Sequence, residues 1–157
     1  MLIKRRSGLA VAAMAALGVV GFGTSVANAS APSITTTQLN QTIIDTQSCS
    51  FPDTQVFTGT VRTISFSDGT VRQHLTLVGT ITANGNTIRD TDHYDVTTTT
   101  DSATKIVGTL IHIVVPGAGL VMIDAGNIAI SPSGDLSFTG RQDQLTGNTA
   151  AFCAALS

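Results

Sequence analysis

Residues 71–98, VRQHLTLVGTITANGNTIRDTDHYDVTT, decide the fold class of this chain. From Val71 to Ala83 apolar and polar residues alternate, which is the period of a strand with one buried face. The next residues, Asn84-Gly85-Asn86, are a strong hairpin signal because Asn and Gly tolerate positive φ. Residues 87–98 then supply the returning strand. The stretch therefore predicts an antiparallel hairpin.

Strands of similar length are predicted on both sides of this hairpin, separated by turns that contain Gly or Pro. We expect a bulge near Arg62-Thr63, because Phe57 and Val61 lie on the opposite parity from Ile64. The stretch 105–115 is almost continuously apolar, which predicts burial on both faces. The further strands are predicted at residues 38–46, 55–66, 105–115, 120–130 with a bend at Gly126, and 136–141, followed by a helical turn within 148–156.

The composition supports an all-β fold. All ten acidic residues are Asp, none is Glu, and Thr is abundant. Glu favours helices, whereas the β-branched side chain of Thr suits a pleated strand. Seven or eight short strands joined by short turns predict an antiparallel meander rather than βαβ units. We expect the meander to close into a barrel of about seven to eight strands, because closure removes exposed edges. A two-sheet β-sandwich is the alternative.

The N-terminus has the three parts of an export signal. The basic segment Lys4-Arg5-Arg6 is followed by an uncharged apolar stretch and then by Ala27-Asn28-Ala29, the small-x-small pattern of a cleavage site. We therefore expect residues 1–29 to be a signal peptide, with cleavage after Ala29 or, as a second choice, after Ala31. The sequence favours the general secretory route, with the twin-arginine route as the alternative. Either route predicts a secreted protein with no membrane span after cleavage.

Export also sets the domain layout and the state of the cysteines. Residues 30–37 are expected to form a flexible leader, and residues 38–157 a single β-domain. Cys49 and Cys153 lie near the two ends of that domain. In an oxidising compartment they are expected to pair. Closing a loop of about 100 residues would stabilise the fold by roughly 4–5 kcal/mol in the chain-entropy account of disulfides.

The mature chain is acidic. Removing the three basic residues of the signal leaves five basic residues against ten acidic ones, a net charge of about −5. This balance disfavours nucleic-acid binding and contact with an anionic membrane surface. Trp is absent and Tyr94 is the only tyrosine, so the chain offers few stacking platforms for sugars or bases. The partners that remain open are an apolar small molecule and a component of the cell envelope.

Candidate chemistry is densest at residues 89–95, RDTDHYD. On a strand, Asp90, Asp92 and Tyr94 share one face with Ile88 and Val96. Two carboxyl groups two residues apart on one face are about 7 Å apart at their bases, so they can share a proton or hold a cation. This face is interpreted as a solvated strand surface, and the alternative is a polar pocket in a barrel interior.

Three histidines are the imidazoles available as general bases. His74 lies on the polar face of its strand and is expected to be exposed, and His93 falls in the polar cluster. His112 lies in an apolar run and is expected to be a core residue, with a place in the pocket as the alternative. No nucleophile elbow, phosphate loop or metal-ligand spacing occurs, so the sequence predicts no catalytic residue, no cofactor and no metal site.

Four segments resemble a family of small secreted actinobacterial β-proteins. They are Cys49-Ser50-Phe51-Pro52, Val61-Arg62-Thr63-Ile64-Ser65-Phe66 with its Asp68-Gly69 turn, Pro116-Gly117-Ala118-Gly119-Leu120-Val121, and Phe152-Cys153-Ala154-Ala155-Leu156. The resemblance covers most of the mature chain, and its motifs are structural. It implies export, a β fold and the disulfide, and it carries over no activity and no catalytic residue.

Two classes of function stay open at this point. We favour a non-enzymatic secreted β-domain that binds a ligand or an envelope component, because barrels of about eight strands can hold one small ligand. The alternative is an enzyme that uses Asp90 and Asp92 with a histidine for acid–base chemistry in a barrel pocket. The two classes differ in whether those carboxyl groups and an imidazole converge on one cavity.

Overall fold

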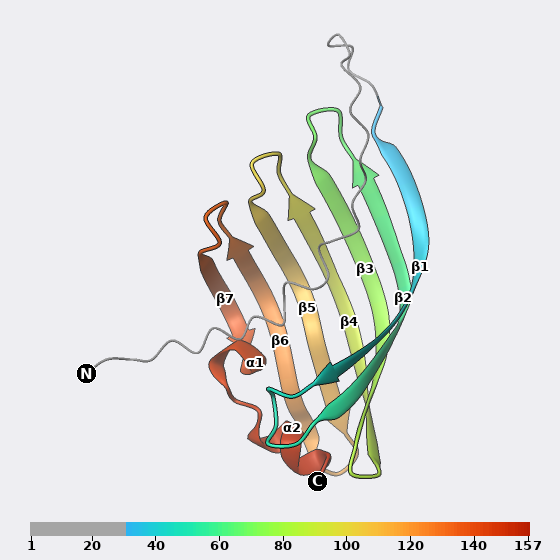
Figure 1. Ribbon diagram of the computed structural model, residues 1–157, viewed down its shortest axis with the longest axis vertical. Helices are drawn as coiled ribbons and strands as arrows, with labels where there is room; N and C mark the ends of the chain where they lie inside the picture. Colours follow the sequence, from blue (N-terminus) through green and yellow to red (C-terminus); the bar gives the residue numbers. More distant parts are fainter. Residues whose placement is uncertain (1–30) are drawn as a thin grey trace, which may run out of the picture.

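The computed structural model describes residues 31–157, which form seven antiparallel strands followed by two short helices (Figure 1). Each strand pairs with its neighbours in sequence, so the order in the sheet is β1-β2-β3-β4-β5-β6-β7. The predicted all-β antiparallel meander is confirmed. The elements are β1 (Ser33–Asp45), β2 (Asp53–Ser65), β3 (Val71–Ala83), β4 (Asn86–Thr98), β5 (Thr104–Val115), β6 (Gly119–Ile130), β7 (Leu136–Gln142), α1 (Asp143–Thr146) and α2 (Ala150–Ala155).

The sheet is open rather than closed into a hydrogen-bonded barrel. Within residues 31–157, β1 pairs only with β2 and β7 only with β6. β7 has seven residues and leads directly into α1, so the 13-residue β1 has no partner of equal length at the other edge. Figure 1 shows the lower ends of β1 and β2 curving toward α2, to which the Cys49–Cys153 disulfide joins the β1–β2 loop.

The pairing register gives the sheet two different faces. The inner face carries the almost fully buried side chains of Phe57, Leu77 and Ile128, together with the residues that share their rows. The outer face carries the alternate residues, among which Thr is the most frequent type, and these include the exposed Val78 and Val107. This alternation is what a strand with one solvated face produces.

β1 begins earlier than the sequence predicts. Ser33 pairs with Ser65, and the ladder runs without interruption to the pair Asp45 and Asp53. Residues 33–37, which were expected in the flexible leader, are therefore part of the sheet. The reason is that the run of β-branched Thr residues there finds backbone partners in β2, so its strand propensity prevails over its loop-like composition.

Two sequence-based expectations about the strands are wrong. β2 keeps an unbroken register with β1 and β3 through Arg62 and Thr63, so no bulge occurs there, and Ile64 lies half-buried on the outer face. β5 is not buried on both faces, because Val107 and Val114 are 44 % and 50 % exposed. An apolar run is therefore compatible with a solvated face when the exposed residues are single valines.

The irregular pairing of this sheet lies between β5 and β6 instead. The register shifts between Thr109 and Ile111, and again between Ile113 and Val114. An extra residue in one strand reverses which face the following side chains occupy. After the first shift, Ile111 and Ile113 face inward and His112 faces outward.

A row of three glycines crosses β5, β6 and β7. Gly108 pairs with Gly126, and Gly126 pairs with Gly140. A Cβ atom on Gly126 would lie 2.2 Å from the carbonyl oxygen of Thr139, and φ at Gly126 is 134°. Only glycine allows such a close approach of two backbones. The bend predicted at Gly126 therefore has a backbone basis in this row.

The C-terminal segment closes one end of the inner face. Phe152 and Leu156 are fully buried and belong to the cluster formed by Ile81 and its neighbours. Cys49, in the β1–β2 loop, is bonded to Cys153 in α2, as the sequence predicts. No helix within residues 31–157 is long and apolar enough to cross a membrane. The predicted signal peptide, residues 1–29, lies outside the described residues.

Candidate functional site

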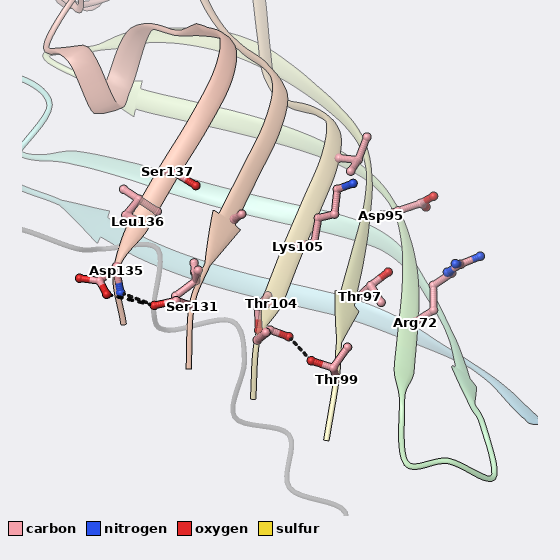
Figure 2. Close-up of a pocket in the computed structure, with 14 residues that line it drawn as sticks. Arg72, Asp95, Thr97, Thr99, Thr104, Lys105, Ser131, Asp135, Leu136 and Ser137 are labelled. Carbon is pink, nitrogen blue, oxygen red and sulfur yellow. Dashed lines mark hydrogen bonds between the residues drawn. The ribbon is translucent and has the colours of Figure 1, made fainter. Parts of the chain in front are cut away.

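A hollow of about 760 Å³ lies on the outer side of the sheet, across β3 to β7 (Figure 2). We call it the outer groove. Figure 2 shows the side chains of Arg72, Asp95 and Lys105 projecting from three neighbouring strands. The apolar part of the lining includes Val107 and Ala129. Hydroxyl groups come from Thr97, Thr99, Thr104, Ser131 and Ser137.

A second hollow, of about 280 Å³, adjoins the outer groove and shares Asp95 and Val107 with it. It contains histidines from two neighbouring strands. Nδ1 of His74 contacts a carboxylate oxygen of Asp95, and Nδ1 of His93 lies 3.3 Å from Oγ1 of Thr76. His74 and Asp95 are close enough to form an ion pair, and Asp95 lines both hollows.

All five basic residues of the described chain lie on the outer face. Arg141 is held by Asp143, with 2.9 Å between Nη2 and Oδ2. The others form no ion pair with any residue of 31–157. These four unpaired cations are Arg62, Arg72, Arg89 and Lys105.

Two of the unpaired cations, Arg72 and Lys105, line the outer groove. Arg72 and Lys105 lie in one row of the sheet, on either side of Thr97. Because neighbouring strands are about 4.8 Å apart, the backbones of Arg72 and Lys105 are about 10 Å apart. Arg62 lies opposite His74 in the next row on the same face. The groove is therefore flanked by cations on a rigid sheet.

Two carboxyl groups, Asp95 and Asp135, line the outer groove. Asp135, like Asp68 and Asp101, is exposed in a turn, where the carboxylate accepts hydrogen bonds from nearby turn residues. The six others are buried, namely Asp45, Asp53, Asp90, Asp92, Asp124 and Asp143. The net negative charge of the chain therefore does not describe the strands of the outer face, on which one carboxylate, Asp95, is set against four unpaired cations. Asp135, in the turn between β6 and β7, adds a second carboxylate at the groove.

Asp90 and Asp92 lie on the inner face with Ile88 and Tyr94, as the strand parity predicts. They are only 1 % and 3 % exposed, so the interpretation as a solvated strand face is wrong. Oδ1 of Asp90 accepts hydrogen bonds from the backbone N–H groups of Thr91 and His112, each at 2.8 Å. Oδ1 of Asp92 has no hydrogen-bond partner among the described residues.

Burial changes the proton affinity of this pair. Burial, together with the neighbouring charge of Asp90, raises the pKa of Asp92 to about 9. Burial also raises the pKa of Asp90, although the N–H group of His112 partly lowers it. Burial raises the pKa of Tyr94 to about 12. At neutral pH, Asp92 therefore keeps its proton and hydrogen-bonds to the Asp90 carboxylate, since two buried like charges cannot both ionise.

The sequence predicts that His112 lies in the core or, as the alternative, in a pocket with Asp90 and Asp92. The structure places its side chain in neither position. The bulge before Ile111 places its side chain on the outer face, where it is exposed. Its backbone N–H group, in contrast, reaches Asp90. The backbone pairing of β4 with β5 ends at His93 and Thr109. Beyond this pair β4 supplies no backbone acceptor for the N–H group of His112, and the Asp90 carboxylate accepts its hydrogen bond instead.

This arrangement separates Asp90 and Asp92 from the histidines with which the sequence-based hypothesis of acid–base catalysis combines them. Asp90 and Asp92 face inward, whereas His74, His93 and His112 are on the outer face. Within residues 31–157, no group of three or more His, Cys or Asp side chains is placed to hold a metal ion. The protein can therefore hold a proton on the buried pair Asp90 and Asp92, while its cationic side chains lie on the outer face.

Sequence reasoning missed the outer groove. The alternation in Val71–Ala83 does place Arg72 and His74 on one polar face, and this was a usable signal. Lys105 lies two strands away, and its row is fixed only by the register of β3, β4 and β5.

No protein-family model, curated protein or solved structure matches this chain. The resemblance to small secreted actinobacterial proteins therefore stays a prediction, and function is argued from the site itself.

Proposed function

We propose that this is a secreted, non-enzymatic binding protein whose outer groove takes an anionic, hydroxyl-bearing polymer of the cell envelope. The observation that carries the proposal is the segregation of charge. Arg72 and Lys105 line the groove without an ion-pair partner in the described chain, and Arg62 lies in the next row of the same face. Two of the ten carboxyl groups, Asp95 and Asp135, line the groove, and six are buried. A face with charge of one sign attracts an extended polyanion even when the net charge of the protein is negative.

The lining of the groove fits such a ligand. Arg binds phosphate and carboxylate groups through two parallel hydrogen bonds, and Lys adds a point charge. The hydroxyl groups of Thr97, Thr104 and Ser137 can donate to and accept from the hydroxyl groups of a polymer. None of the lining residues is aromatic. Charge and hydroxyl contacts, rather than stacking, would therefore supply the affinity.

Two further observations support the non-enzymatic, secreted part of the proposal. The buried pair Asp90 and Asp92 and the three histidines occupy opposite faces, so this carboxyl pair and an imidazole do not converge on one cavity. The imidazole–carboxylate contact in the second hollow is between His74 and Asp95. The Cys49–Cys153 disulfide and the N-terminal export signal both suit an oxidising compartment outside the cytoplasm.

Arg72→Gln is expected to weaken polyanion binding about fivefold, because the loss of one groove cation removes roughly 1 kcal/mol of interaction. Binding is measured by isothermal titration at low salt with two probes, inorganic polyphosphate and polygalacturonate. These probes distinguish a polymer with phosphate groups from one with carboxylate groups. Affinity for the preferred probe should fall steeply as salt is raised, because exposed charges are screened.

Arg89→Gln is the matched control. It removes the same charge from the same face, at a position outside the lining of the groove, and is expected to change affinity less than Arg72→Gln does. Neutral dextran is the matched probe without charge. Equal losses for the two variants would indicate non-specific attraction, and equal binding of dextran and both polyanions would overturn the proposal.

A further inference from the structure

β1 has a long edge that no strand of the described chain covers. Its ladder is with β2, and no other element packs extensively along it. From Ser33 to Ile44 it contains no charged residue, no Pro and no Gly. Edge strands are normally protected by charge, Pro or a bulge, because an unpaired row of N–H and C=O groups recruits another strand. The unprotected edge of β1 therefore points to a pairing partner.

Large apolar side chains stand at both ends of this edge strand. Ile34 and Ile44, both on the outer face, are 54 % and 68 % exposed. Between them the outer-face positions are polar, with Thr36, Gln38 and Asn40 all exposed. Apolar residues at the two ends of a strand, with polar residues between them, suit a partner that has the same pattern in reverse.

We propose that two copies of this chain pair through β1, antiparallel and centred on Leu39. In this register Leu39 lies opposite Leu39 of the second copy, and Ile34 lies opposite Ile44. Polar residues then oppose polar residues, with Thr36 opposite Thr42 and Gln38 opposite Asn40. Asp45 lies opposite Ser33, so no like charges meet. Cross-strand pairs of this kind are the unit of sheet stabilisation.

Other registers lose this complementarity. A shift of two residues in one direction places Ile34 opposite Thr42, and in the other direction it places Ile44 opposite Thr36. A shift of one residue would bring outer-face side chains opposite inner-face ones, which strand pairing does not allow. The centred register therefore combines both isoleucine pairs with a two-fold axis, the usual symmetry of soluble dimers.

β7 is the competing edge, but it fits β1 poorly. It has seven residues, includes Arg141, and ends where α1 begins. Pairing of β1 with β7 of another copy would be head-to-tail, and such contacts continue into filaments unless they form a ring. Pairing of β1 with β1 is closed at two copies and covers both unprotected edges.

The test introduces charge at Gln38 and Asn40, which are exposed in the single chain and opposed in the proposed dimer. In Gln38→Lys/Asn40→Lys each Lys faces a Lys of the second copy. The dimer dissociation constant, measured by sedimentation equilibrium of the purified protein, is expected to rise at least tenfold. Gln38→Glu/Asn40→Lys places Glu opposite Lys twice, and its dissociation constant should stay within threefold of the parent.

The matched pair of variants makes the register itself falsifiable. Both alter the same two exposed positions, and circular dichroism checks that both keep the sheet. A parent protein that is monomeric at hundreds of micromolar would overturn the proposal. Equal weakening in both variants would overturn the centred register, since only that register places position 38 opposite position 40.

Discussion

Replacing both half-cystines, as Cys49→Ala/Cys153→Ala, is expected to lower the free energy of unfolding by about 4 kcal/mol. The bond joins residues 104 apart in sequence, so its loss frees a long loop in the unfolded chain. The effect is large because domains of this size have only about 5–15 kcal/mol of stability in total. Urea titration followed by far-ultraviolet circular dichroism measures the change.

The reduced parent protein is the control for the two alanine substitutions. Treatment with dithiothreitol under native conditions should lower the unfolding midpoint of the parent to near that of the variant and leave the variant unchanged. A variant that unfolds at the same urea concentration as the oxidised parent would contradict the prediction. It would mean that the packing of Phe152 and Leu156 alone holds the C-terminal segment in place.

The disulfide matters in this fold because hydrogen bonds do not join β1 to β7. Besides the bond, the β1–β2 loop touches the C-terminal segment through a few polar contacts, such as Oγ1 of Thr149 donating to the carbonyl oxygen of Ser48 at 2.8 Å. Nε2 of Gln144 donates to Oγ of Ser48 at 3.2 Å. These bonds are individually weak. Phe51 of the same loop also packs against the cluster that contains Phe152 and Leu156, and the disulfide adds a covalent link to these contacts.

The local part of the fold was predictable from sequence. The hairpin at Asn84-Gly85 forms as expected, with φ of 51° and 85° at the two residues. The strand Val71–Ala83 has the bounds that its alternation predicts. Such signals are local because turn conformations and the two-residue period depend on neighbouring residues alone.

The errors share one physical cause, which is that pairing is not local. The outward direction of His112 follows from the bulge before Ile111, and that bulge is defined by where β6 pairs. The open edge at β1 depends on the length of β7, far away in sequence. The burial of Asp90 and Asp92 depends on what packs against the inner face, whereas parity predicts only that they share it.

The stability of the protein is expected to fall as the pH rises from about 5 to 9, by at least about 2 kcal/mol. Burial raises the pKa of Asp92 to about 9 and also raises the pKa values of Asp90, Asp53 and Asp124. The folded protein therefore holds protons in this range that the unfolded chain has already released. Stability decreases with pH wherever the folded state binds more protons.

Two carboxyl groups act in the opposite direction, at lower pH. A hydrogen bond from Arg141 lowers the pKa of Asp143, and one from Thr99 lowers the pKa of Asp101. These two groups contribute fully to the free energy of unfolding above the ordinary pKa of a carboxyl group. That contribution is lost as the pH falls below this value. The stability maximum is therefore expected in the mildly acidic range, between the titration of these groups and that of the buried pair.

The variant Asp92→Asn tests how much the buried pair Asp90 and Asp92 contributes to the pH dependence of stability. The amide cannot ionise and can still donate a hydrogen bond to Asp90, as the protonated carboxyl group does. The variant should be more stable than the parent at pH 9 and should lose most of the decrease between pH 5 and 9. Thermal melts across this range measure both effects, with a difference of several degrees at pH 9.

Asp68→Asn makes the same chemical change at an exposed carboxyl group in the β2–β3 turn, and its stability curve should run parallel to that of the parent. A parent curve that stays flat between pH 5 and 9 would contradict the prediction and would show that the buried pair is already ionised in the fold at pH 5. In that case Asp92 would hold a charge with no hydrogen-bond partner for Oδ1 among the described residues. Such a buried, uncompensated charge would cost several kcal/mol, which is why the protonated form is expected.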